Sequence, residues 1–211
     1  LDARVDAGAR QLERSPQKRI GVQAETQPDL VVLVLAALRA RRILVPLSTR
    51  WPRAMLDHAI ANLNLTVLIT DGGEVEGTGI LSLQDLAQPD DIQCPVADLQ
   101  LDVPCTIIHT SGSTGVPKAA LHTVGNHIAS AKGLLRRFPL GPGDRWLLNL
   151  PLYHVGGLAV VIRCALAGAT MGLPERGMSM AKAFQTLQPT HASLVSTQLI
   201  RLLDENVELA S

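Results

Sequence analysis

The sequence predicts an α/β protein in which parallel-sheet layers are covered by helices. Short apolar runs rich in β-branched residues alternate with longer helical segments through residues 19–70, and the alternation resumes after residue 140. Hydrophobic residues make up 46% of the 211 residues, which is enough to bury a sizeable core. That core belongs to one large domain or to two small ones.

The first part of the chain predicts a helix followed by the order β-α-β-α-β. Leu1, Val5 and Leu12 recur among charged neighbours, as on one face of a helix whose beginning is absent. Strands are expected at 19–24, 43–47 and 65–70. Helices are expected from Pro28 to the arginines at 39, 41 and 42, and at 53–62. Because such crossovers pack helices onto the faces of one sheet, this order makes the strands parallel.

The remainder of the chain has a less periodic stretch and then a second alternation. Residues 71–102 contain Gly, Pro and Asp at short intervals and are predicted as loop, with one short helix near 83–86 and a candidate subdomain boundary. A strand, a loop and a second strand are expected within 103–123. The further expected elements are a helix at 126–138, a turn at 141–144, a strand at 145–150, a helix at 157–166 ended by Gly168, a helix at 180–187, a strand at 191–195 and a helix at 196–204.

The composition argues against nucleic-acid and membrane functions. The 19 basic and 19 acidic residues cancel, and aromatic residues, at 2%, provide few stacking platforms for bases. The longest strongly apolar run, 30–38, is too short to cross a bilayer, and the N-terminus carries no signal-peptide pattern. Three widely spaced cysteines without a C-x-x-C pair favour a reducing cytoplasm over a disulfide framework or a zinc cluster.

Most of the chemistry-bearing residues stand in one loop between the two apolar runs 103–109 and 119–123. The loop contains, in order, Thr110, Ser111, Gly112, Ser113, Thr114, Gly115, Val116, Pro117 and Lys118. Its glycines allow a tight turn and a close approach of backbone N–H groups, its hydroxyls add donors, and its lysine adds a flexible point charge. These features predict a polyphosphate site.

Two familiar motifs do not fit this loop. The P-loop requires lysine directly after its second glycine, whereas Val116 follows Gly115. The G-x-S-x-G nucleophile elbow requires a glycine two residues before the serine, whereas Gly112 directly precedes Ser113. A plain surface loop rich in Gly, Ser and Thr is the remaining alternative, and the strict continuation to Lys118 argues against it.

The loop resembles the phosphate-binding signature (S/T)-(S/T)-G-(S/T)-T-G-x-P-K of the adenylate-forming enzymes, and every position matches. This superfamily includes acyl-CoA synthetases, luciferases and peptide-synthetase adenylation domains. Three later segments, 118–123, 150–155 and 190–195, are similar to one branch, the o-succinylbenzoate–CoA ligases of menaquinone (vitamin K2) synthesis. The resemblance extends over nearly the whole chain.

The resemblance implies an AMP-forming acid–CoA ligase that uses ATP, Mg²⁺ and coenzyme A and acts on a small carboxylic acid. Family members are longer and carry further motifs and a small C-terminal lid domain. Residues 1–211 are therefore expected to be a partial N-terminal AMP-binding domain, with activity belonging to the full-length parent. Two alternatives stay open: a non-catalytic nucleotide-binding remnant, and an acyl-CoA synthetase of another carboxylic acid. A kinase is disfavoured because no Walker-type lysine or metal-binding aspartate motif is found.

His154 is the candidate catalytic residue, in a positioning role. It stands where the strand predicted at 145–150 passes into a loop, and ligands collect at strand ends of α/β sheets. The alternative is a histidine that only hydrogen-bonds to the backbone. In related ligases the matching position lies between the acyl pocket and the thiol channel, which favours the functional interpretation.

Arg163 is the candidate substrate-binding residue, a lone cation inside the apolar run 158–166. Its side chain must either reach water along the protein surface or meet an anion, because an unpaired buried charge is costly. The resemblance makes it the partner of a second carboxylate on a dicarboxylic substrate. One departure stands nearby: the branch usually has His-Val-Ser-Gly where this chain has Gly156 after Val155, which leaves the exact acyl substrate open.

The ligands of a metal ion are not evident in the sequence. Mg²⁺ is expected to bind through the nucleotide and to keep waters, and no Asp or Glu is marked as its ligand. His122 and His127 are five residues apart, which does not place them on one helical face and makes them a poor metal pair.

Overall fold

The computed structural model describes residues 1–71, 79–83, 100–110 and 117–207. The chain forms two compact units, Leu1–His127 and Ile128–Ser211. The range 71–102 falls inside the first unit and lies mostly outside the described residues, so the candidate boundary there stays a prediction. Among the described residues, no helix is both long and apolar enough to cross a membrane.

The first unit is built on a six-stranded sheet in the order β4-β3-β1-β2-β5-β6. Its strands are β1 (Arg19–Gln23), β2 (Ile43–Pro46), β3 (Val67–Thr70), β4 (Gly79–Ser82), β5 (Pro104–Thr110) and β6 (Lys118–Thr123). The first five strands pair in parallel, and β6 pairs antiparallel with β5 at the edge. The predicted parallel sheet is therefore confirmed, and so are the two strands predicted within 103–123.

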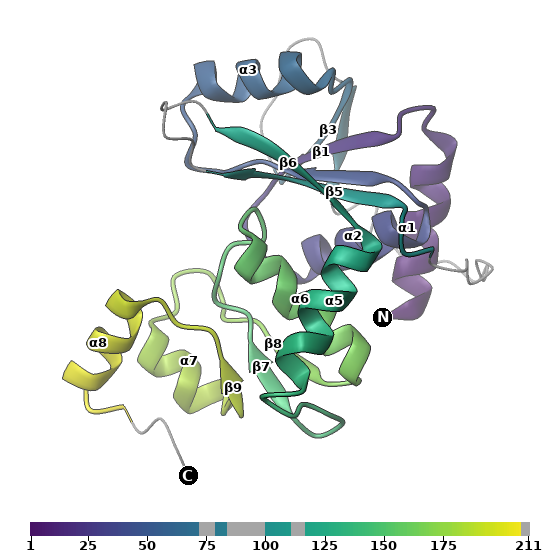
Figure 1. Ribbon diagram of the computed structural model, residues 1–211. Helices are drawn as coiled ribbons and strands as arrows, with labels where there is room; N and C mark the ends of the chain where they lie inside the picture. The colour runs from purple at the N-terminus through teal and green to yellow at the C-terminus, as the bar shows by residue number, and fades with distance from the viewer. Residues whose placement is uncertain (72–78, 84–99, 111–116, 208–211) are drawn as a thin grey trace. The chain divides into compact units, whose positions relative to one another are not determined.

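Helices cover both faces of this sheet (Figure 1), with α3 (Arg53–Leu63) on one side and α1 (Asp2–Arg14) and α2 (Pro28–Arg39) on the other. Leu56, Ala59 and Leu63 of α3 pack on buried residues of the sheet. α1 packs on α2, and Arg39 of α2 pairs with the buried Asp6 of α1. α2 lies between the sheet and α1, so nearly all sides of this helix are buried. This explains why its apolar residues run almost all the way round it.

The second unit is built on a three-stranded parallel sheet in the order β8-β7-β9. Its strands are β7 (Arg145–Leu147), β8 (Thr170–Gly172) and β9 (His191–Ala192). Its helices are α6 (Val155–Ala167), α7 (Met180–Leu187) and α8 (Ser196–Asp204), while α5 (Val124–Leu135) spans the point of division. α6 ends at Gly168, which has a left-handed φ of 68°, as the sequence predicts.

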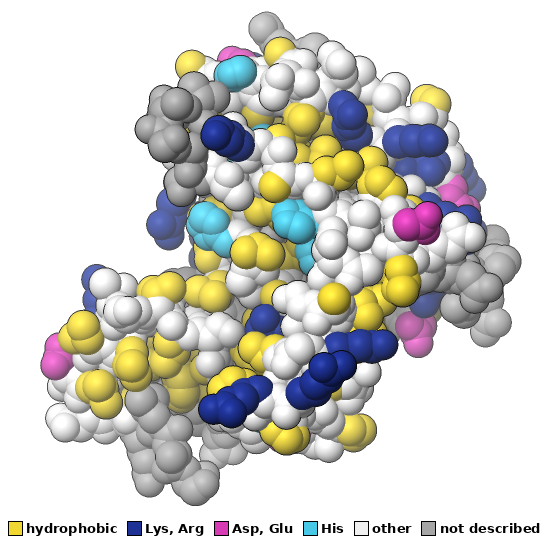
Figure 2. Space-filling view, viewed as in Figure 1, with side chains coloured by type: hydrophobic (Ala, Val, Ile, Leu, Met, Phe, Trp, Pro, Cys, Tyr) yellow, Lys and Arg dark blue, Asp and Glu magenta, His cyan; other side chains and the backbone are white. Residues whose placement is uncertain are grey.

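α8 buries little of its apolar surface. Leu202 is 1% exposed, whereas Leu199, Ile200 and Leu203 are 40%, 56% and 55% exposed, and Val195 just before the helix is 50% exposed. Figure 2 shows hydrophobic side chains, in yellow, at the surface over this helix at the left of the view. The helix therefore presents an apolar face to solvent.

Two strands correct the sequence predictions. β4 forms within 71–102, which we predict as loop, and β8 forms at 170–172, where no strand is expected. Both are short and contain glycine, so neither carries enough β-branched residues or alternation to be recognised alone. The strands expected at 145–150 and 191–195 are also shorter than predicted. Of the short helix expected near 83–86, all but Leu83 lies outside the described residues.

Candidate active site

The hairpin β5–β6 holds the ends of the candidate phosphate loop. Thr110 ends β5, Lys118 begins β6, and the two are register partners whose side chains are both exposed. The Thr110 hydroxyl donates a hydrogen bond to the Lys118 carbonyl at 3.4 Å. The structure thus brings these two predicted residues together. The predicted residues between them, Ser111, Gly112, Ser113, Thr114 and Gly115, lie outside the described residues.

The base of this hairpin is anchored by a buried histidine. Thr106 in β5 and His127 in α5 are both buried, and Thr106 Oγ1 lies 2.8 Å from His127 Nε2. Burial, and secondarily the charge of His122, lowers the pKa of His127 to about 4. At neutral pH the imidazole is therefore uncharged. This contact ties β5 to α5, the helix that follows the hairpin.

The rings of His122 and His127 lie next to each other, with centroids 5.4 Å apart. They come from β6 and α5, so the helical-face argument for judging them as a pair does not apply. The described residues contain no cluster of three or more His, Cys, Asp or Glu side chains suited to a metal ion. The magnesium ligands remain unassigned.

A cavity of about 380 Å³ opens beside the two ends of the loop. It is lined by residues at the start and along one face of α3 and by His109 and Pro117, which flank the loop: Trp51, Pro52, Ala54, Met55, His58, Ala59, Asn62, His109 and Pro117. The rings of Trp51 and His109 meet edge to face at a centroid distance of 4.9 Å. His109 Nδ1 is buried without a hydrogen-bond partner among the described residues, and burial lowers the pKa of this imidazole.

Sequence reasoning missed this cavity. Trp51 marks only a helix start in the sequence, and His109 is only the last residue of an apolar run. One signal in the sequence could have found it. Neighbouring parallel strands end at the same edge of the sheet, so the residues that follow one strand lie close to the end of the next. β2 and β5 are such neighbours, so Trp51 after β2 and His109 near the end of β5 come together.

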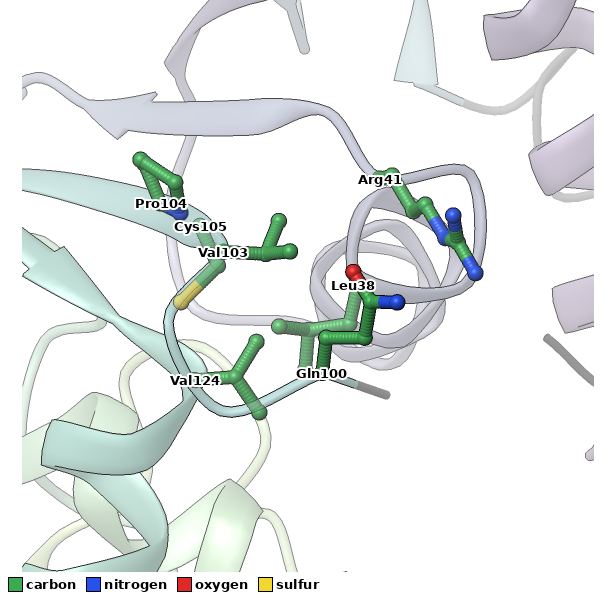
Figure 3. Close-up of a pocket in the computed structure, with 7 residues that line it drawn as sticks. All are labelled: Leu38, Arg41, Gln100, Val103, Pro104, Cys105 and Val124. Carbon is green, nitrogen blue, oxygen red and sulfur yellow. The ribbon is translucent and has the colours of Figure 1, made fainter. Parts of the chain in front are cut away.

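A second, much smaller pocket lies at the opposite end of β5 (Figure 3). Leu38, Arg41, Gln100, Val103, Pro104, Cys105 and Val124 line it. Its volume of about 10 Å³ holds a single water at most. Burial raises the pKa of the Cys105 thiol to about 11, so this cysteine is a protonated core residue rather than a nucleophile. The small pocket is therefore part of the packing and not a ligand site.

In the second unit, His154 occupies the N-cap position of α6, and its side chain makes no capping hydrogen bond there. Its side chain is exposed, and its backbone N–H donates to the Pro151 carbonyl at 3.1 Å. The Tyr153 ring lies 4.7 Å from the imidazole, centroid to centroid. A tight turn before the helix thus presents His154 at the surface of the unit, in the position between strand and helix that the sequence predicts.

Glycine is required at the first turn of α6. A Cβ at Gly157 would lie 2.4 Å from the Pro151 carbonyl oxygen and 2.5 Å from that of Leu150, distances that real side chains do not adopt. A Cβ at Gly156 would meet only Leu150 Cδ1, at 3.2 Å. The Leu150 methyl therefore lies beside the position where the branch usually carries a serine side chain and this chain has none.

Arg163 lies half-buried on α6 with its guanidinium over the indole of Trp146. The Cζ atom is 5.3 Å from the ring centroid, within the range of a cation–π contact. Its Nε is buried and has no hydrogen-bond partner among the described residues. Burial lowers the pKa of this guanidinium, although the charged form persists at neutral pH. The contact with Trp146 is not foreseen from the sequence.

Comparison with known proteins decides the family. The family of AMP-binding enzymes matches residues 1–210. The chain belongs to this family. The 2-succinylbenzoate–CoA ligases of Salmonella typhimurium and Escherichia coli are 38% and 36% identical to it over 188 residues, which is 86% of this chain and 39% of each relative. The chain therefore spans about two fifths of the length of these AMP-binding enzymes.

Solved structures of AMP-binding enzymes share the fold. An arginine-to-lysine variant of E. coli MenE with bound OSB-AMS is 32% identical, with a TM-score of 0.85 over 98% of this chain and 46% of that chain. The o-succinylbenzoate coenzyme A synthetase of Bacillus subtilis in complex with AMP is 25% identical, with a TM-score of 0.87 over 98% of this chain and 57% of that chain. The α/β fold predicted from the sequence is confirmed.

Proposed function

We propose that this chain is the N-terminal part of an ATP-dependent acid–CoA ligase, and that its acid is o-succinylbenzoate, an intermediate of menaquinone biosynthesis. The observation that carries the proposal is the complete adenylate-forming signature between Thr110 and Lys118, with both ends on one β-hairpin. The relatives of the same family that carry the name 2-succinylbenzoate–CoA ligase support the choice of acid.

The reaction has two steps. The substrate carboxylate attacks the α-phosphorus of ATP, which releases pyrophosphate and gives an acyl-adenylate. The thiol of coenzyme A then attacks the acyl carbon, gives up its proton, and displaces AMP. Neither step needs a nucleophile from the protein, so the chain contributes positioning and charge stabilisation.

The ends of the loop fit a phosphate ligand. Lys118 is exposed, so its ammonium is free to turn toward a phosphate, and the Thr110 hydroxyl stands beside it. A lysine acts on phosphate as a point charge and needs no fixed plane. Mg²⁺, which prefers to keep waters and to bind phosphates, is proposed to arrive with the nucleotide and to neutralise part of its charge.

Arg163 is the proposed partner of the second carboxylate of the acid. Its Nε is a buried donor that meets no acceptor in the part of the chain that the structure describes, and a buried unsatisfied donor costs about 1–3 kcal/mol. A ligand carboxylate would supply acceptors in the geometry that a guanidinium fork prefers. His154, exposed at the start of the same helix, is proposed to position the reacting acyl group.

Two further statements belong to the proposal. Coenzyme A is the expected thiol substrate because the named relatives are CoA ligases. A cytoplasmic location is proposed because Cys105 and Cys164 are both buried free thiols, which suits a reducing compartment.

ATP–pyrophosphate exchange tests the function. The protein encoded by the full reading frame that contains this chain is expected to exchange pyrophosphate into ATP when o-succinylbenzoate is present. Lys118→Ala is expected to lower the exchange rate about ten- to a hundredfold, because a charge-assisted contact to phosphate is lost. Lys132→Ala, which removes an exposed lysine of α5, serves as the matched control and is expected to leave exchange unchanged. An unaltered rate in Lys118→Ala would remove the loop from the site.

Arg163→Ala tests the choice of acid. It is expected to raise the KM for o-succinylbenzoate about ten- to a hundredfold and to leave the KM for ATP nearly unchanged. Arg163→Lys is expected to restore only part of the loss, since an ammonium lacks the bidentate fork. The comparison acid is 4-oxo-4-phenylbutanoate, which has the same skeleton without the ring carboxylate. Equal losses of kcat/KM for both acids would exclude Arg163 from the acid site.

A second acid remains a candidate because of Gly156. The branch usually carries a serine at this position, and a Leu150 methyl occupies the space beside the glycine here. A carboxylic acid that makes no hydrogen bond at this point would then be preferred. Turnover of a panel of aromatic and aliphatic acids by the full-length protein distinguishes the two: a higher kcat/KM for any other acid than for o-succinylbenzoate would favour the second candidate.

A further inference from the structure

Trp146 has three polar partners, a guanidinium and an imidazole against its ring and a hydroxyl at its N–H. Arg163 lies over one part of the ring at 5.3 Å, and His191 stacks beside it with centroids 5.2 Å apart and planes inclined by 26°. The indole N–H donates to Ser193 Oγ at 3.3 Å. Trp146 is only 4% exposed, so its indole makes these contacts inside the unit and away from water.

The sheet of the second unit explains why these residues meet. Trp146 in β7 and His191 in β9 are register partners in a parallel ladder, so their side chains project from the same face. α6 carries Arg163 onto this indole. The backbone of Arg163 therefore lies in the helix α6, while its guanidinium packs on the indole of Trp146, a residue of the sheet.

The Trp146 indole is itself held in place by contacts from the segment that follows β9. The Asn149 amide donates to the Ser193 carbonyl at 2.9 Å and to Gln198 Oε1 at 3.3 Å. The indole hydrogen bond to Ser193 selects one orientation of the ring about its side-chain torsions. Ser193 is thus the residue that both Trp146 and Asn149 contact, and it links the ring to the backbone of the C-terminal part of the unit.

Stacking on an aromatic face affects a guanidinium differently from pairing it with a carboxylate. The contact holds the plane of the cation and keeps its charge, and it leaves the N–H edge unused. Arg163 Nε finds no hydrogen-bond acceptor among the residues described, which is consistent with such an unused edge. A cation held in this way loses less side-chain freedom when it binds an anion, so binding becomes more favourable.

We infer that Trp146 is a positioning residue that holds Arg163 for a second carboxylate of the acid, and that Ser193 acts through Trp146 by fixing the indole. The inference rests on the proposed function, because it takes Arg163 to be the carboxylate partner. It makes the selection of dicarboxylic over monocarboxylic acids a property of the Ser193–Trp146–Arg163 chain of contacts. Neither Trp146 nor Ser193 touches the acid in this arrangement.

The test compares two acids with three variants of the full-length protein. Trp146→Leu removes the aromatic face, Trp146→Phe keeps a face but loses the indole N–H, and Ser193→Ala removes the acceptor. The acids are o-succinylbenzoate and 4-oxo-4-phenylbutanoate, and the measurements are kcat and KM for each acid and KM for ATP. Leu202→Ala, which truncates a buried residue of α8 that takes no part in the hydrogen bonds and ring contacts named above, is the matched control for lost stability.

Trp146→Leu is expected to raise the KM for o-succinylbenzoate about tenfold, with kcat and the KM for ATP nearly unchanged, so that the preference for the dicarboxylic acid falls. Trp146→Phe is expected to restore most of that preference, and Ser193→Ala to lose about threefold. Leu202→Ala is expected to lower Tm without changing the preference. These readouts separate positioning from stability, which affects both acids alike.

Two results overturn the inference, and they differ. If the wild type activates neither acid, the proposed function fails and the inference fails with it. If the wild type prefers the dicarboxylic acid and Trp146→Leu keeps that preference, or loses kcat/KM equally for both acids, the inference fails alone while the proposed function stands.

Discussion

Lys118 and Arg163 are the two cations on which the proposed chemistry depends, and they lie in opposite environments. Lys118 is exposed at the mouth of a hairpin, where water and salt screen its charge. Arg163 is half-buried on an indole, where a charge interacts more strongly with an anion and its plane is held in advance. A flexible charge suits the changing geometry of a phosphate, and a fixed fork suits recognition of a carboxylate.

His127 makes stability depend on pH in a defined direction. Its pKa is lowered from 6.5 to about 4 in the folded chain, so the unfolded chain binds the proton more readily. The resulting stability is fully present above pH 6.5 and is lost progressively as the pH falls toward 4. The loss is on the order of 1–3 kcal/mol after allowance for solvent screening.

Denaturant unfolding of the chain between pH 7 and 4 measures this dependence. His127→Phe is expected to flatten the decline of the unfolding free energy over this interval, although it also loses the contact with Thr106. His58→Gln, which removes an exposed histidine of the same unit, is expected to keep the wild-type slope. A slope that survives in His127→Phe would assign the pH dependence to other groups.

Single residues were predictable from the sequence where the chain itself brings them together. Thr110 and Lys118 flank one short loop, so a hairpin places them side by side whatever surrounds it. The contact of Arg163 with Trp146 depends instead on which residue of a strand lies under a helix. That choice is made by side-chain packing between elements and leaves no periodic signal in the sequence.

The close packing of Gly157 against the preceding turn leaves no room for a side chain at the start of α6. A Cβ at Gly157 would collide with two backbone carbonyls, and backbone cannot move aside as a side chain can. Gly157→Ala is therefore expected to lower the free energy of unfolding by about 1–3 kcal/mol, as overpacking does in cores. Equilibrium unfolding of the chain in urea measures the change.

Gly133→Ala is the matched comparison for this prediction. Gly133 lies in α5, and apart from its chain neighbours and the backbone of its own helix, no atom of the described residues lies within 4 Å of the position where its Cβ would stand. Alanine there is expected to stabilise the chain by about 0.5–1 kcal/mol, because glycine is a poor residue inside a helix. A loss of stability in Gly133→Ala, or no loss in Gly157→Ala, would contradict the packing described here.

At the scale of elements, the helices were more predictable than the strands. α8 follows its predicted range 196–204, and α7 its predicted range 180–187, because amphipathic spacing and flanking residues mark both ends. β8 and β4 gain their pairing from β7 and β3, which already form the sheets. Strands of three or four residues at a sheet edge are defined by the partner rather than by their own sequence.

At the scale of the molecule, the chain consists of two units that each have a parallel sheet and its helices. The first contains the hairpin that bears the signature, and the second contains His154 and Arg163. Under the proposed function, the phosphate-binding residues belong to the first unit and the acid-binding residues to the second. The relatives are longer than this chain, which covers 39% of the first of them.

The exposed apolar face of α8 is expected to make the chain bind hydrophobic dyes and self-associate. Leu199 and Leu203 are four residues apart in α8, so they share one side of the helix. Val195 immediately precedes the helix, and all three side chains are exposed. Contiguous exposed apolar surface of this kind binds hydrophobic dyes and promotes self-association. The 211-residue chain is therefore expected to bind 8-anilinonaphthalene-1-sulfonate and to self-associate with rising concentration.

A double variant assigns this behaviour to α8. Leu199→Lys with Leu203→Lys is expected to reduce dye fluorescence and self-association, measured by fluorescence titration and sedimentation velocity, with little change in Tm because both side chains are exposed already. Gln185→Lys with Thr186→Lys on α7 adds the same two charges at exposed positions without removing apolar surface. If both double variants reduce the signals equally, added charge rather than the α8 face accounts for the change, because only the first pair alters the apolar surface.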